Sequence, residues 1–175
     1  GNGGAIDLDA GGDITTQDIN SSSNSRGDSG KHYSRNGGDI KLNAGGDINT
    51  QELDSSSSAS PNKGNSGNGG AIDLHAGDNI TIKRIYSNSF IYNEVGSYSS
   101  SGDGGAIDLV AGGDITLHGD IETNSYTYSG NSGNGGDIDF VAGGNITTQD
   151  LDSSTFSYSG NSGNGGAIDL VAGGD

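Results

Sequence analysis

The chain has 175 residues and a net charge of −16, and only 28% of its residues are hydrophobic, whereas 35 are glycine. This composition excludes a conventional globular core and is typical of disorder unless a regular array orders the chain. The absence of Cys excludes disulfides and thiolate metal sites. The acidity argues against nucleic acid as a partner, and no apolar run is long enough for membrane insertion.

Six copies of one motif follow each other along the chain at intervals of about 32 residues. Their glycine pairs start near residues 3, 37, 69, 104, 135 and 165. The motif reads GNGGAIDLDAGGD at 1–13 and returns as GNGGAIDLVAGGD at 163–175. Residues 1–175 are therefore expected to form one array of five coils and a partial sixth, cut from a longer array whose export signal lies outside it.

Within the first copy, Ile6 and Leu8 flank Asp7, and this alternation predicts a strand with the two apolar side chains inward. A glycine-rich corner follows, and a second strand opens with Ile14. A third apolar position, Ile19, comes five residues later, and its odd offset predicts another corner. A Ser/Gly/Asn segment closes each coil.

These features predict an all-β parallel β-solenoid with one coil per 30–35-residue repeat. One coil has too few apolar side chains to fold alone, but stacked coils merge them into a continuous core. The alternative is a disordered low-complexity linker. It is disfavoured because such a linker has no reason to return Ile and Leu to the same phase six times.

The unit N-G-G-[AD]-I-D-[LF]-x-A-G-G-[DN]-I-T resembles the repeats of filamentous-haemagglutinin-type exoproteins, which Gram-negative bacteria export by two-partner secretion. The resemblance covers nearly the whole chain. It implies a right-handed, three-sided β-helix, a secreted or cell-surface location, and a role in adhesion, aggregation or filament formation. The coil here is longer than that family's common coil, so the Ser/Gly segment is expected to bulge out or to form a further strand.

An acidic column is expected on the outward position of the first strand. Like charges stacked about 4.8 Å apart repel one another unless they are solvated or bridged by a cation such as Ca²⁺. Both interpretations stay open: a solvated face that needs no cofactor, or a calcium ladder. The adjacent corner column of Asp and Asn is a second place for such an ion. A calcium-binding nonapeptide roll does not fit, because no nine-residue period is present. The candidate ligands are Asp73, Asp108, Asp139 and Asp169.

Pairs of aromatic residues recur in the third to fifth coils. They either cap the core of a wide coil or face outward as a ladder suited to a glycan or a protein. A separate candidate is the integrin-type tripeptide Arg26-Gly27-Asp28 in a polar loop. The aromatic pairs are Phe90/Tyr92, Tyr126/Tyr128 and Phe156/Tyr158.

Catalysis finds no support in the pattern. His32, His75 and His118 occupy unrelated repeat positions, and no nucleophile stands beside a base at a recognisable spacing. We therefore expect a non-enzymatic shaft or fibre of an adhesin-like surface protein, continued covalently or by end-to-end self-association. The alternative is a binding module that uses the aromatic ladder, or a calcium-binding extracellular matrix repeat.

Overall fold

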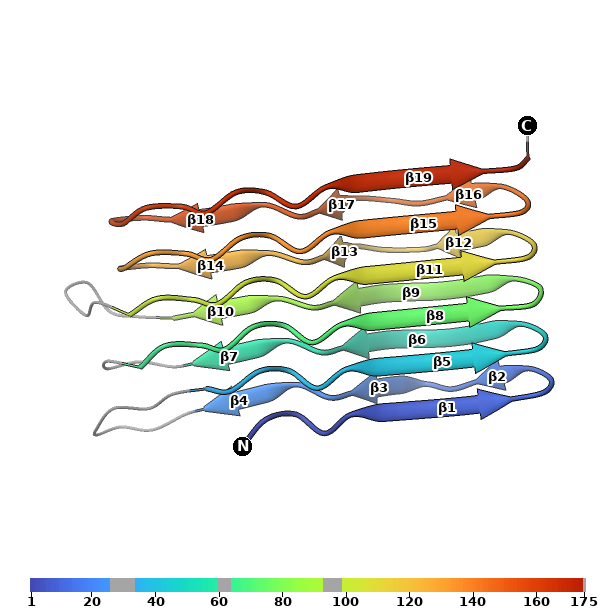
Figure 1. The fold of residues 1–175 in the computed structure, drawn as a ribbon, viewed down its shortest axis with the longest axis horizontal. Helices are drawn as coiled ribbons and strands as arrows, with labels where there is room; N and C mark the ends of the chain where they lie inside the picture. The colour runs from blue at the N-terminus through green and yellow to red at the C-terminus, as the bar shows by residue number, and fades with distance from the viewer. Residues whose placement is uncertain (26–33, 60–63, 93–98, 175) are drawn as a thin grey trace.

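A computed structural model describes residues 1–25, 34–59, 64–92 and 99–174. The described chain is a parallel β-solenoid with no helix, built from three sheets to which each of the five complete coils contributes. In Figure 1 the chain runs to the right along the front wall and to the left along the rear wall as it rises from the N-terminus. The coils are therefore right-handed. The solenoid predicted from the repeat is confirmed.

Sheet A contains the I-x-L-x-A strands, with Phe140 in place of Leu in the fifth coil, and forms one wall of the apolar core. Its strands pair in parallel without a register shift, so each Ile stacks on Ile and each Ala on Ala. The six strands are β1 (Ile6–Ala10), β5 (Ile40–Ala44), β8 (Ile72–Ala76), β11 (Ile107–Ala111), β15 (Ile138–Ala142) and β19 (Ile168–Ala172).

Sheet B faces sheet A across the core. The predicted corner between Ile14 and Ile19 is absent from this sheet, so that prediction was wrong. In the second coil one unbroken strand, Ile48–Asp54, spans both apolar positions. The odd offset arises from a bulge-like irregularity, because the Gln17 carbonyl accepts the N–H groups of both Gln51 and Glu52. The strands are β2 (Ile14–Thr15), β3 (Asp18–Asn20), β6 (Ile48–Asp54), β9 (Ile80–Tyr86), β12 (Ile115–Leu117), β13 (Ile121–Glu122), β16 (Ile146–Thr147) and β17 (Leu151–Asp152).

Sheet C is formed by the serine-rich segment, which therefore supplies the further strand of the longer coil. Figure 1 shows sheets B and C following one another along the rear wall, so the cross-section is elongated, although three sheets line it. The strands are β4 (Ser23–Ser25), β7 (Ser57–Ala59), β10 (Ser89–Ile91), β14 (Ser125–Thr127) and β18 (Thr155–Ser157).

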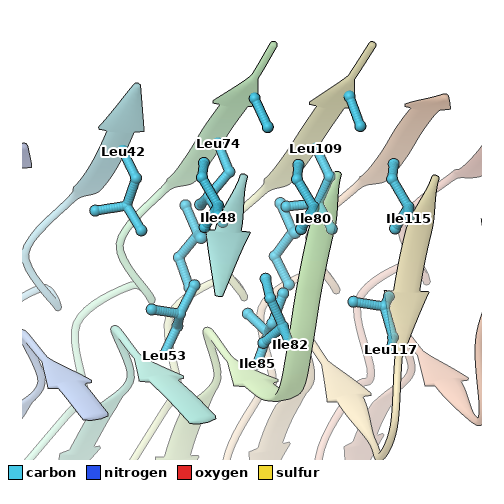
Figure 2. Close-up of a cluster of buried hydrophobic side chains, with 14 of the residues drawn as sticks. Leu42, Ile48, Leu53, Leu74, Ile80, Ile82, Ile85, Leu109, Ile115 and Leu117 are labelled. Atoms are coloured by element: carbon cyan, nitrogen blue, oxygen red, sulfur yellow. The ribbon is translucent and has the colours of Figure 1, made fainter. Parts of the chain in front are cut away.

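The apolar core lies between sheets A and B, as the alternation predicted (Figure 2). Leu42, Leu74 and Leu109 from sheet A are fully buried against Ile48 and its equivalents from sheet B. Leu8, in the first coil, is 38% exposed, because β1 pairs on one side only. The stacked columns thus give small side chains the burial that no single coil provides.

The N-G-G motif pinches the two walls of each coil together. In the third coil, a Cβ added at Gly69 would lie 2.2 Å from the Ser87 carbonyl oxygen and 2.7 Å from the Gly105 nitrogen. These two atoms form a 2.7 Å hydrogen bond across the interior, from Gly105 N–H to Ser87 C=O. The first glycine of the motif is therefore required by this close approach.

Beyond the pinch, the interior is filled mostly by hydroxyl groups, and the aliphatic side chains of Ala59 and Ile91 are also buried there. Ser57 and Ser89 on sheet C are fully buried, and the Ser89 Oγ lies 2.7 Å from the Ser66 Oγ on the returning segment. The Ser89 Oγ also donates to the Gly67 carbonyl at 2.8 Å. Each complete coil thus has an apolar compartment and a serine-rich compartment, and the buried hydroxyls are hydrogen-bonded except the Ser99 Oγ, which has no partner among the described residues.

Candidate functional site

The predicted acidic column lies on the outer face of sheet A. Asp73, Asp108, Asp139 and Asp169 occupy one register position on successive strands, and Lys41 precedes them in the same column. Partial burial, followed by the charge of Asp73, raises the pKa of the Asp108 carboxyl. The column is therefore a row of carboxylates that repel one another.

A histidine lies beside this column in the third coil. The His75 Nε2 lies 2.8 Å from the Asp73 Oδ1, and both side chains are partly exposed. Within the described ranges, no group of three or more His, Asp and Glu side chains is placed to hold a metal ion. The calcium ladder stays a prediction that a titration has to test.

The corner column adjacent to the second strand has a structural role. Asp47 Oδ1 accepts the backbone N–H of Asn79 at 2.9 Å, and Asn79 Oδ1 accepts that of Asp114 at 2.8 Å. These side chains therefore tie each corner to the next coil. One oxygen of each is already engaged and is less available to an ion.

The Asn and Asp residues before the glycine pairs form a second ladder of the same kind. Asn68 Oδ1 accepts the backbone N–H of Asp103 at 3.0 Å, and Asp103 Oδ1 accepts that of Asn134 at 2.6 Å. These side chains have a structural role, because each bonds the backbone of the next coil. The side chains of this ladder link backbone to backbone across the coils, as part of the scaffold.

The six predicted aromatic residues lie on the outer face of sheet C, so the interpretation that they cap the core is wrong. Tyr92 and Tyr158 are 65% and 68% exposed. The Tyr126 and Phe156 rings lie 5.4 Å apart and nearly parallel, and those of Tyr128 and Tyr158 lie 5.2 Å apart. These distances suit offset stacking, so the rings form two exposed columns.

The aromatic columns begin abruptly at the third coil. Phe90 pairs in register with Ser58 of the second coil, and Ser58 pairs with Asn24 of the first. Because the first two coils have small side chains at this position, a groove of about 420 Å³ lies beside Phe90 and Tyr92. Its lining residues are Ser22, Asn24, Asp54, Ser56, Ser58, Tyr86, Asn88, Phe90, Tyr92 and Glu122. The sequence predicted the aromatic rings but not this groove. The feature of the sequence that could have indicated it is the change from Ser58 to Phe90 at equivalent positions of the second and third repeats.

Hydrogen bonds hold the polar side chains along the rim of the groove. Asn88 Nδ2 donates to Glu122 Oε2 at 3.1 Å, and Asp54 Oδ1 accepts the Ser56 N–H at 2.9 Å. Burial raises the pKa of the Glu122 carboxyl, and the Asn88 hydrogen bond opposes this shift. The groove thus combines three aromatic side chains, those of Tyr86, Phe90 and Tyr92, with fixed amide and carboxylate groups.

The other candidates from the sequence are the integrin-type tripeptide and the histidines. Arg26-Gly27-Asp28 lies outside the described residues, as does His32. His118 is exposed, and its equivalents in the neighbouring coils are not histidines. No helix in the described ranges could cross a bilayer.

The chain was also compared with known proteins, and no protein-family model, curated protein or solved structure matches it.

Proposed function

We propose that this chain is the shaft of an extracellular, adhesin-like fibre at a bacterial surface, with a structural role that requires no catalysis. The observation that carries the proposal is the unbroken register of sheet A, in which six strands pair over their full five residues. Such a stack has no internal joint, so its length grows with each repeat by about 4.8 Å.

The surface properties support an exposed fibre. The outer column of sheet A is acidic and the net charge is −16, which disfavours lateral association through charge repulsion. The absence of Cys makes the fold independent of redox conditions. The resemblance of the repeat to filamentous-haemagglutinin-type exoproteins supports the same location and export by two-partner secretion.

Immunogold electron microscopy of intact cells of the source organism tests the location. We expect antibodies raised against this chain to decorate fibres that project from the cell surface. Antibody first absorbed with the purified protein is the control and should remove the label. Gold particles confined to the cell interior would contradict the proposal.

Electron microscopy of the purified protein tests the mode of extension. Fibres much longer than one parent chain would indicate end-to-end stacking, which an open strand edge permits. Rods of one uniform length would indicate that the array continues covalently. Compact globular particles would contradict the shaft in both forms.

A further inference from the structure

We propose that the groove beside Phe90 and Tyr92 binds a neutral oligosaccharide, a function beyond that of a shaft. The two rings lie 6.2 Å apart and are inclined by only 27°, so they form one platform. In the fourth and fifth coils the rings cover one another by stacking, but Phe90 has Ser58 as its neighbour in the second coil. The side of the platform toward the second coil therefore borders the hollow instead of another ring.

The chemistry of the lining fits a sugar. Aromatic rings stack on the C–H faces of pyranoses, and the groove places amide, hydroxyl and carboxylate groups beside its rings. Asn88 and Asp54 are already held by neighbouring groups, so little side-chain entropy is lost when a ligand binds. Vicinal sugar hydroxyls can donate to the Asp54 and Glu122 carboxylates and accept from the amides.

The charge of the lining residues and the backbone pairing of β10 restrict which class of ligand can bind. The described lining residues include Asp54 and Glu122 but no Lys or Arg, which disfavours acidic glycans. A peptide strand cannot add to the sheet here, because β10 is paired on both sides, by β7 and β14. The volume of about 420 Å³ suits a few sugar units.

The first test is native gel electrophoresis through gels that contain one soluble polysaccharide at a time. The neutral probes are hydroxyethylcellulose, xyloglucan, galactomannan and glycogen, and polygalacturonate is the acidic probe. We expect at least one neutral polysaccharide to retard the protein and polygalacturonate not to do so. Retardation by none of the neutral polysaccharides, or a stronger effect of polygalacturonate, would overturn the proposal.

Matched variants locate the binding. Phe90→Ser introduces the residue that the second coil carries at this register position, so the fold should persist, and we expect at least a tenfold loss of affinity. Phe156→Ser removes a ring of the same column outside the groove and should leave the affinity unchanged. Equal effects of the two substitutions would refute the assignment to the groove.

A third variant fills the groove without removing either ring. Ser58→Phe extends the aromatic column into the second coil and occupies the hollow, so binding should be lost while thermal stability is kept or raised. Thermal unfolding recorded by circular dichroism checks that all three variants are folded. Undiminished binding by a folded Ser58→Phe protein would overturn the proposal.

Discussion

The pinch between the two walls of the coil gives the sharpest test of the structure. In a Gly69→Ala variant the new methyl group would clash with both the Ser87 carbonyl oxygen and the Gly105 nitrogen, which form the 2.7 Å hydrogen bond that joins the walls. The Ser87 oxygen would have to move from 2.2 Å to an ordinary contact distance of 3.4 Å or more. That movement breaks the hydrogen bond, so the two walls no longer meet at the end of the apolar compartment.

Two costs set the size of the effect. Overpacking a tightly packed interior costs about 1–3 kcal/mol. Leaving a buried donor or acceptor without its partner costs about 1–3 kcal/mol as well. We therefore expect Gly69→Ala to lower the free energy of unfolding by about 2–6 kcal/mol.

Urea unfolding followed by tyrosine fluorescence measures this loss, since the chain has seven Tyr and no Trp. Gly11→Ala is the control, because nothing lies within 4 Å of a Cβ added at Gly11. That substitution should change the unfolding free energy by less than about 0.5 kcal/mol. A Gly69→Ala protein that unfolds at the same urea concentration as the wild type would refute the pinch.

Three further predictions concern the core and the acidic column. Leu74→Ala removes a fully buried side chain between Leu42 and Leu109 and should cost about 2–5 kcal/mol in urea unfolding; a loss below about 1 kcal/mol would contradict the core. Asp108→Asn should stabilise the protein by about 0.2–1 kcal/mol at neutral pH, because it removes a repelling charge. Since the Asp108 pKa is raised on folding, its contribution to stability falls as pH rises from the ordinary Asp value through the raised value, and melting temperatures across that range should show a weaker decline in the variant. If the column binds calcium, millimolar Ca²⁺ should raise the wild-type melting temperature and have less effect on Asp108→Asn, whereas no effect on the wild type contradicts the calcium ladder.

Several features of the fold could be predicted from the sequence because they repeat with a fixed phase. The alternation of Ile72, Asp73 and Leu74 has only one arrangement in a strand with one buried face, so the inward Ile and Leu and the outward Asp followed directly. The structural role of the Asn68 column was also predictable. An Asn at the same position of successive coils can bond to the next backbone, whatever the details of the coil.

The tertiary structure alone decided which polar residues are buried and where the rings point. Ser57 and Ser89 are buried because the returning segment brings other hydroxyls and carbonyls against them, a contact between positions more than 20 residues apart. The local pattern around Phe90 has no contrast between an apolar and a polar face, so it could not show that the ring faces outward. The groove depends on the register between Ser58 and Phe90, which is fixed only when the second and third coils pair. Periodicity thus determined the strands and the apolar core, whereas contacts between coils determined the serine-rich compartment, the pinch and the candidate site.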